Sequence, residues 1–421
     1  MAVLNKRAIF ASASGNLLQW YDFAVFGFFA PAISMQFFPA DDRMAGLLKT
    51  FGVFAVGYLA QPIGGILFGH LGDRIGRKRA LQLSIILMAI PTTLMCLLPT
   101  HAQIGLWAPL LLVLLRLAQG LSAGGEIIGA VCYLVEVAPP RRRALYGSFV
   151  ECGVIGGILA GSAVATLFHM TLSHEALAQW GWRLPFLGGL VLGILGWSLR
   201  RGLLETPVFQ EILDRGETAA RPVIQAIRQL PLRIAFLAGM LIVFCVALNI
   251  LFLWMPVYLT HIVHPPVAHA LLINTFALMV IIMVIVPTGA LTDRIGHKPV
   301  LAIAMIAMAA VAYPLLVWMD TGALAAVIVG QTVFAVLMGL IVGATPVAMA
   351  SPFPPELRYS GMAIGLNVSV AIFSGTAPFI ATWLIQETGN LASPSWYVAA
   401  AAVVSCAASL ALRDVLTRNG K

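Results

Sequence analysis

Four ionisable side chains lie in stretches of sequence that otherwise carry almost no charge: Asp22, Arg116, Glu126 and Glu151. Long apolar runs flank each of them, so each is expected inside a membrane-spanning helix, where an ionisable group is costly and marks a candidate functional site. At about 1.5 Å of helix rise per residue, Asp22 and Arg116 both come near the middle of the membrane. We therefore expect these two side chains to form a pair.

A spacing of three residues places Gln19 with Asp22 and Gln119 with Arg116 on shared helix faces. A buried carboxylate is held ionised by a neighbouring arginine and pushed toward its neutral form by desolvation. Movement of the arginine can therefore make the carboxylate take up or release a proton, which is the chemistry of a proton-coupled carrier. The alternative is a static ion pair that fixes helix packing.

Glu126 and Glu151 are expected about 12–15 Å from the nearer ends of their helices. They are predicted either to form an acidic site that receives the proton or contacts a cationic group of a substrate, or to be protonated packing residues. In the second case Ser122 and Ser148 are expected to hydrogen-bond them. Burial alone can neutralise a carboxyl group, so both interpretations stay open.

Charged residues are few throughout the chain, as expected of a membrane protein. Of 421 residues, 60% are hydrophobic and 10% are charged, against roughly 25% charged in a soluble domain. A spanning helix needs roughly 20 apolar residues, and the chain supplies about twelve such stretches, near 8–35, 44–70, 80–98, 106–137, 144–168, 182–200, 233–260, 267–291, 299–319, 322–350, 361–386 and 395–412. The predicted fold is an all-α membrane protein with 12 transmembrane helices.

The net charge of +8 reflects membrane topology. Most of the Lys and Arg residues fall in alternate loops, and the positive-inside rule makes that side cytoplasmic, with both termini on it. The basic balance therefore predicts no nucleic-acid partner. The expected partners are the lipid bilayer and a small-molecule substrate, and we expect a functional monomer.

A ten-residue unit occurs twice in the chain. Residues 69–78 recur in altered form as residues 289–298, so that Asp293 follows Asp73 by 293 − 73 = 220 residues. Parallel repeats are typical of secondary transporters, with the substrate site between the halves. We predict a six-helix bundle over 1–200, a cytoplasmic linker over 201–232, and a second six-helix bundle with a short tail over 233–421.

The repeated loop also predicts a cytoplasmic gate. Its glycines permit a tight turn, and Asp73 is expected to cap the helix that follows. The basic side chains of the loop are expected to pair with acids across the loops, with Glu136 and Arg143 as the reciprocal cluster. A plain positive-inside anchor explains the charges but not the repeated spacing. The predicted gate residues are Asp73, Arg74, Arg77, Glu136, Arg143, Asp293 and Arg294.

The second half carries almost no buried charge, so its uncharged polar residues are the candidates for substrate contact. Most are expected to pack helices together, as polar groups in membranes commonly do. The predicted substrate-binding residues are Gln19, Tyr21, Arg116, Gln119 and Glu151 in the first half and Asn249, Trp254 and Asn367 in the second.

Neither catalytic nor cofactor chemistry is expected. The eight histidines form no metal-ligand pattern, there is no phosphate-binding glycine loop, and the loops leave no room for a soluble catalytic domain. The five cysteines fall in predicted spans and are odd in number, so no disulfide framework is expected. The sequence predicts a protein that is not an enzyme and binds no cofactor or metal, with protons as the coupling ion.

Several motifs together resemble the major facilitator superfamily over nearly the whole chain. The loop at 69–78 is similar to that superfamily's signature between spans two and three. Four further segments resemble its metabolite:proton symporter branch: Gly15-Asn16-x-x-x-Trp20-Tyr21-Asp22-Phe23, Arg116-x-x-Gln119-Gly120-x-Ser122-Ala123-Gly124-Gly125-Glu126, Trp180-Gly181-Trp182-Arg183-x-Pro185-Phe186 and Leu204-Glu205-Thr206-Pro207-Val208-Phe209.

The resemblance implies an inner-membrane importer that moves a small polar metabolite with protons by alternating access. Known substrates of the branch are citrate-like acids, dicarboxylates, shikimate, and proline or betaine. The long coiled coil of osmosensing members is absent, which argues against that role. The alternative is a proton-antiport exporter of a small molecule or metallophore, because Cys152-Gly153-x-x-Gly156-Gly157 approaches an exporter motif but lacks its proline.

Overall fold

The computed structural model describes residues 6–39, 43–216, 221–263, 267 and 269–415, and within these ranges it is helical without strands. Parts of the predicted linker and tail, residues 217–220 and 416–421, lie outside the described residues. Eleven helical segments of the described chain are long and apolar enough to cross a membrane. The 23-residue helix α1 (Lys6–Phe28) packs among them as the twelfth, so the predicted all-α membrane fold is confirmed.

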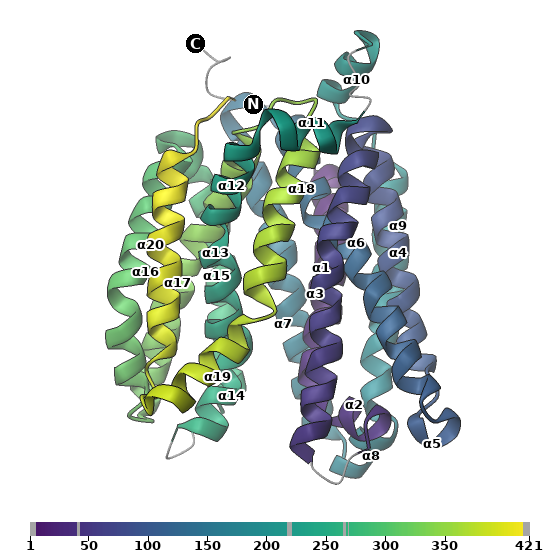
Figure 1. Ribbon diagram of the computed structural model, residues 1–421, viewed down its shortest axis with the longest axis vertical. Coiled ribbons are helices and arrows are strands. Elements are labelled where there is room, and N and C mark those ends of the chain that lie inside the picture. The colour runs from purple at the N-terminus through teal and green to yellow at the C-terminus, as the bar shows by residue number, and fades with distance from the viewer. Residues whose placement is uncertain (1–5, 40–42, 217–220, 264–266, 268, 416–421) are drawn as a thin grey trace.

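The first half contains six long helices and three short ones. Its long helices are α1, α3 (Arg43–Arg74), α4 (Arg77–Leu97), α6 (Trp107–Val137), α7 (Arg143–Thr171) and α9 (Leu184–Arg201). The short helices α2 (Ala30–Phe37), α5 (His101–Ile104) and α8 (His174–Gln179) lie together at one end of the bundle (Figure 1).

The second half repeats this arrangement with two interrupted helices. Its continuous helices are α15 (Ala270–Ile295), α16 (His297–Met319), α17 (Leu324–Ala350) and α20 (Pro394–Ala411). One interrupted helix runs through α12 (Pro231–Met240), α13 (Ile242–Leu248), η3 (Asn249–Trp254), α14 (Met255–Val257) and η4 (Tyr258–Ile262), and the other through α18 (Arg358–Ser369), η5 (Val370–Ser374) and α19 (Ala377–Thr388).

The interruptions include π-helical turns, η3 and η4 in the first helix and η5 in the second, while an ordinary turn at Leu241 separates α12 from α13. The sequence predicted single spans near 233–260 and 361–386. A π turn shifts the backbone hydrogen bonds of a helix, and such turns are frequent at functional sites. In η3, the side-chain amides of Asn274 on α15 and Gln331 on α17 donate to the carbonyls of Phe252 and Leu251, at 2.9 and 3.2 Å. These two amides therefore act as helix-packing groups.

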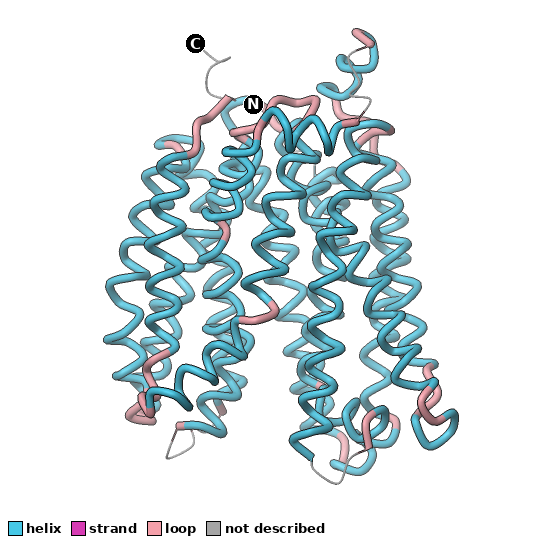
Figure 2. The backbone as a smooth tube through the Cα atoms, viewed as in Figure 1, coloured by secondary structure: helices cyan, strands magenta, loops and turns pink. Residues whose placement is uncertain are grey.

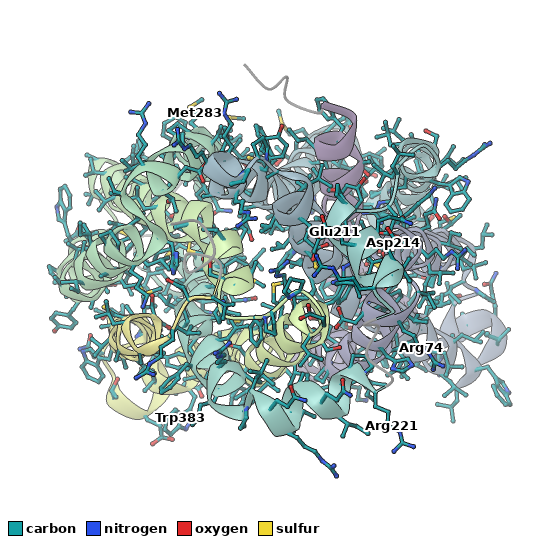
Figure 3. All side chains as sticks on the ribbon, turned by 90° about the horizontal axis from the view of Figure 1, so that it is seen from above. Arg74, Glu211, Asp214, Arg221, Met283 and Trp383 are labelled. Atoms are coloured by element: carbon teal, nitrogen blue, oxygen red, sulfur yellow. The ribbon has the colours of Figure 1, made fainter. Side chains whose placement is uncertain are left out.

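Helix α1 begins and α20 ends at the same end of the bundle, which we call the terminal end; the opposite end is the distal end (Figure 1). The two halves are in contact at the terminal end, and their ribbons diverge toward the distal end (Figures 1 and 2). Between the halves in sequence, α10 (Pro207–Asp214) and α11 (Pro222–Gln229) lie at the terminal end. Viewed from that end, Arg74 and Arg221 project from the edge of the bundle (Figure 3).

Within the first half, α3 and α6 cross with their backbones in contact. A Cβ atom at Gly64 of α3 would overlap the carbonyl of Leu121, and one at Gly120 of α6 would overlap the carbonyl of Gly57. Small residues four apart allow this approach in membranes, where van der Waals packing drives helix association. This crossing fixes the helices that carry Tyr58 and Arg116.

We expect Gly64→Ala to destabilise the protein, because the new methyl group meets main chain that cannot rotate away; overpacking of this kind costs about 1–3 kcal/mol. The matched control is Gly52→Ala on the same helix, where a Cβ atom has no neighbour within 4 Å. The melting temperature in detergent should fall by several degrees for Gly64→Ala and stay level or rise for Gly52→Ala. Equal melting temperatures for the two variants would contradict the close crossing.

Candidate functional site

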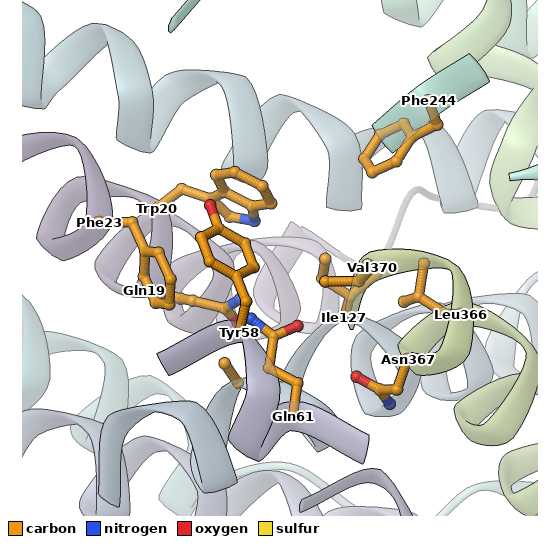
Figure 4. Close-up of a pocket in the computed structure, with 11 residues that line it drawn as sticks. Gln19, Trp20, Phe23, Tyr58, Gln61, Ile127, Phe244, Leu366, Asn367 and Val370 are labelled. Atoms are coloured by element: carbon orange, nitrogen blue, oxygen red, sulfur yellow. The ribbon is translucent and has the colours of Figure 1, made fainter. Parts of the chain in front are cut away.

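A pocket lies between the two halves at the middle of the bundle (Figure 4). Helices α1, α3 and α6 supply one wall, and α13, α18 and η5 supply the other. The lining residues are Gln19, Trp20, Phe23, Tyr58, Gln61, Ala123 and Ile127 from the first half and Phe244, Leu366, Asn367 and Val370 from the second. None of them is ionisable near neutral pH, so the wall carries no formal charge.

Aromatic rings dominate the first-half wall. The centroids of Phe23 and Tyr58 lie 4.9 Å apart in an edge-on arrangement, and those of Trp20 and Phe23 lie 6.3 Å apart. Three polar atoms of this wall have no hydrogen-bond partner among the described residues: Gln19 Oε1, Trp20 Nε1 and Tyr58 OH. Buried polar atoms are rarely left unpaired, so these three atoms are available to a water molecule or to the polar groups of a ligand.

The predicted pair of Asp22 and Arg116 forms directly behind Phe23. Arg116 Nη1 lies 2.7 Å from Asp22 Oδ2, and Gln119 Nε2 donates to Asp22 Oδ1 at 2.9 Å. The guanidinium also lies over the Phe26 ring, 3.8 Å from its centroid. The side chains of Asp22 and Arg116 are fully buried, and neither lines the pocket. The Phe23 ring lines the pocket and its centroid lies 5.6 Å from the guanidinium carbon of Arg116, so the pair lies behind this wall.

Of the predicted substrate-binding residues, Gln19 and Asn367 line the pocket, whereas Arg116, Gln119 and Glu151 do not. Tyr21 points away and donates from its OH to the carbonyl of Pro185 at 2.7 Å. Asn249 donates to the carbonyl of Cys245 on its own helix at 2.8 Å, and Trp254 packs against Tyr258. Neither residue belongs to the lining of the pocket.

Glu126 has a partner that the sequence analysis missed. The carboxylate is in ion-pair contact with Arg200 of α9 and accepts a hydrogen bond from Ser84 of α4, while Arg200 Nε donates to the carbonyl of Ala11 on α1 at 3.0 Å. A Cβ atom at Gly15 would overlap both charged groups, which explains a glycine at that position. The sequence places Arg200 beside Arg201 near the end of a predicted span, where basic residues commonly mark the cytoplasmic side.

The expected serine partners are not formed. Ser122 Oγ donates to the carbonyl of Ser84 at 2.6 Å, and Ser148 Oγ donates to the carbonyl of Leu145 at 2.8 Å. The prediction that Ser122 and Ser148 hydrogen-bond the carboxyl groups of Glu126 and Glu151 is therefore wrong. Hydroxyl groups on a helix commonly turn back to their own or a neighbouring backbone instead.

Glu151 is buried on α7, with 1% of its surface exposed, and no cation or hydrogen-bond donor pairs with it among the described residues. Gly147 and Ser148 occupy the same helix face, four and three residues earlier. Gly147 packs against Pro346 of α17, and Ser148 packs against Gly289 of α15. Glu151 therefore faces the second half, at the seam formed by α7, α15 and α17.

At the terminal end, a cluster of paired charges joins the halves. Glu136 Oε2 lies 3.3 Å from Arg77 Nε, and Glu136 Oε1 lies 3.0 Å from Arg358 Nη1 of the second half. Arg77 Nη2 also donates to the carbonyl of Pro355 at 2.7 Å. Arg77 of the repeated loop thus pairs across the loops with Glu136, as predicted, but Arg358 and not Arg143 occupies the other carboxylate oxygen.

The two repeated aspartates bond to opposite halves. Asp73 accepts a hydrogen bond from the backbone N–H of Ser360, at the start of α18, at 2.9 Å. Asp293 accepts from the backbone N–H groups of Ala144 and Leu145, at the start of α7, at 2.8 and 2.9 Å. Each carboxylate thus meets the positive end of a helix dipole in the other half.

The expectation that Asp73 caps the helix following its own loop is therefore wrong. Glu205 of the linker does so instead: its Oε1 accepts from the backbone N–H of Arg77 at 3.1 Å and of Lys78 at 3.3 Å. Gly76 has φ of +108° and leaves room for Glu205. Arg74 and Arg294 are exposed and lie outside the paired cluster, while Arg143 is partly buried beside it.

Sequence reasoning also missed Tyr58, Gln61 and Phe244 in the pocket. Tyr58 and Gln61 are three apart on α3, on the face that meets the second half, so helical spacing was a usable signal. For Phe244 no local signal exists, because an apolar residue in an apolar span reads as core or lipid-facing. Within the described ranges, no group of three or more His, Cys, Asp or Glu residues is placed to hold a metal ion.

The chain is similar over nearly its full length to known proteins. The chain is 34% identical, over 98% of its length and 84% of the relative's, to the proline/betaine transporter of Salmonella typhimurium. It is equally similar to the glycine betaine/proline/ectoine/pipecolic acid transporter OusA of Dickeya dadantii. Among solved structures, the proton:xylose symporter XylE superposes with a TM-score of 0.81 over 96% of this chain and 94% of that one, at 16% identity.

The family model of the Major Facilitator Superfamily matches residues 13–364. The predicted resemblance is thereby confirmed, and so is the prediction of a transporter that is not an enzyme. A multi-pass helical bundle with a pocket between two six-helix halves, and relatives that are transporters over nearly its full length, lead to one conclusion: this chain is a membrane transporter that belongs to the Major Facilitator Superfamily.

Proposed function

We propose that the protein imports a small zwitterion, of the proline or betaine type, together with protons across the cytoplasmic membrane, and that the terminal end faces the cytoplasm. The observation that carries this proposal is the uncharged aromatic pocket between the halves. A substrate with no net charge suits a wall with no net charge, since an unmatched ion in such a wall would be strongly disfavoured. The curated relatives named for proline and betaine transport support this substrate class.

The two ends of such a zwitterion match different parts of the pocket. Trp20, Phe23 and Tyr58 from one half and Phe244 from the other present ring faces and edges to the interior. A cation that lies over an aromatic face gains about 2 kcal/mol when desolvated, and quaternary ammonium groups are bound in this way. The unpaired Trp20 Nε1 and Tyr58 OH are donors for the carboxylate.

Glu151 is the favoured proton carrier. Asp22, Glu126 and Glu136 each have an arginine partner, whereas Glu151 has none among the described residues. An unpaired carboxyl group in an apolar site is stable when protonated and becomes charged when water reaches it. Because Glu151 lies at a seam between the halves, rocking of one half against the other would expose it and bury it again. No further cofactor is required by this scheme.

The substrate assignment predicts a specific effect of Tyr58→Phe. The ring that packs against Phe23 is kept, but the unpaired hydroxyl is lost, so KM for betaine or proline uptake should rise about 5–30-fold, the equivalent of about 1–2 kcal/mol. The control is Tyr21→Phe, which removes the hydroxyl bonded to the Pro185 carbonyl outside the pocket. Tyr21→Phe should lower the melting temperature and leave KM unchanged.

Uptake of radiolabelled betaine and proline into proteoliposomes is the measurement. If Tyr58→Phe transports with an unaltered KM, the hydroxyl does not bind the substrate. If an inward proton gradient drives no uptake of either compound by the parent protein but drives extrusion of a substrate, the protein is an exporter and not an importer.

The proton assignment predicts separable effects of two similar substitutions. Glu151→Gln keeps the shape of the neutral side chain, so betaine exchange across the membrane should persist while accumulation driven by a proton gradient is lost. Glu126→Gln instead leaves Arg200 buried without its counter-charge, a change that destabilises proteins by about 3–5 kcal/mol. Its main effect should therefore be loss of folded protein.

These outcomes are read from counterflow, gradient-driven accumulation and thermal unfolding of the two variants side by side. Full accumulation by Glu151→Gln, with normal proton dependence, would exclude Glu151 as the carrier and leave the paired carboxylates Asp22 and Glu126 as the remaining candidates.

A further inference from the structure

Asn367 belongs to the pocket and also holds the halves together. It lies on α18 with its side chain buried, and it lines the pocket opposite Gln61 (Figure 4). Its Nδ2 donates to the carbonyl of Gly124 on α6, in the other half, at 2.8 Å, and to the carbonyl of Ala363 on its own helix at 2.8 Å. A primary amide has two N–H donors, so both donors of Asn367 are in use.

The bond to Gly124 can be released at little cost to α6. Gly124 lies in the interior of that helix, where its carbonyl already has a helical backbone partner, and a carbonyl oxygen has a second lone pair for the side chain. Losing the Asn367 bond therefore leaves no orphaned backbone acceptor. The amide is also held closely, because a Cβ atom at Gly65 of α3 would overlap it.

A second tether of the same kind lies closer to the terminal end. The hydroxyl of Tyr359, eight residues before Asn367 on α18, donates to the carbonyl of Gly125 on α6 at 2.9 Å. Tyr359 does not line the pocket. The chain thus provides two hydrogen bonds between α18 and neighbouring carbonyls of α6, of which only one can be reached by a ligand in the pocket.

We propose that Asn367 is a positioning residue that a bound zwitterion releases: the substrate carboxylate takes the Asn367 N–H from the Gly124 carbonyl and so loosens the closed terminal end. The proposal rests on the proposed function, because it requires a carboxylate in the pocket. A hydrogen bond to a carboxylate is roughly twice as strong as one to a neutral carbonyl, so the exchange is favourable. Tyr359 lies out of reach of the ligand, so its hydrogen bond to the Gly125 carbonyl is kept both with and without substrate.

Linkage makes this exchange testable. If substrate loosens the terminal end, then a protein already loosened at Asn367 has nothing left for the substrate to release. Cys132 is a built-in reporter: it is fully buried at the terminal end, with Sγ 3.3 Å from Glu136 Oε1. Opening of that end exposes its thiol to alkylation.

The experiment uses the full-length protein in nanodiscs with Cys96, Cys152, Cys245 and Cys406 replaced by serine, so that only Cys132 reacts with N-ethylmaleimide. Saturating betaine should raise the alkylation rate of Cys132 in this parent roughly 3–10-fold, as expected for loss of one neutral hydrogen bond. In Asn367→Leu the rate should already be high and should not respond to betaine. In Tyr359→Phe the rate should be raised without betaine and should rise by the parent's factor when betaine is added.

The proposal is overturned if Asn367→Leu keeps the parent's response to betaine, or if Tyr359→Phe loses it. Gly65→Ala provides a second variant that displaces the amide without removing it, and it should match Asn367→Leu. Betaine and proline binding is measured separately by calorimetry. If the parent binds neither compound, the proposed function fails; if it binds betaine but Cys132 does not respond, only the role of Asn367 fails.

Discussion

A charge inside the hydrocarbon layer has to be matched by the protein itself, and the arrangement of the first half follows from this constraint. Asp22 on α1 is matched by Arg116 on α6, and Glu126 on α6 by Arg200 on α9. Because removal of one member of such a pair leaves the other uncompensated, the pairs tie the positions of these helices together. Glu151 is the exception in the described chain, and it lies at the seam where α7 packs against α15 and α17 of the other half.

The repeated loop has a different role from the buried pairs. Both copies end a helix with an aspartate, and each aspartate bonds the first backbone N–H groups of a helix in the opposite half. Arg74 and Arg294 take no part in these bonds and are exposed, whereas Arg77 Nη2 lies 3.3 Å from Asp73 Oδ1. The copies differ four residues after the aspartate, where Arg77 enters the inter-half cluster and His297 lies 3.4 Å from Asp414. Both copies of the loop therefore bond a helix of the opposite half, but only the first copy contributes an arginine to the charge cluster around Glu136.

Sequence reasoning predicted what depends on local pattern or on depth. Spans follow from apolar length, the duplication from spacing, and the Asp22–Arg116 pair from equal depth in the membrane. It missed the contacts that depend on which face of each helix is turned toward its neighbour. Arg200 and Arg201 are adjacent and identical in type, yet only Arg200 turns inward to Glu126. In the same way, Asp73 is the acidic residue nearest to α4 in the sequence, yet the packing of the linker brings Glu205 to the start of that helix.

Substrate and proton are handled at separate seams in this scheme. The pocket lies where α3 and α6 meet α18, whereas Glu151 lies where α7 meets α15 and α17. The groups that bind the substrate need not touch the group that carries the proton, and the neutral pocket keeps the zwitterion from competing for Glu151. Coupling must then act through the relative position of the two halves, since both seams lie between the same two bundles. A change that opens one seam alters the water access of the other, which is why a tether such as Asn367 can influence a proton site that it does not contact.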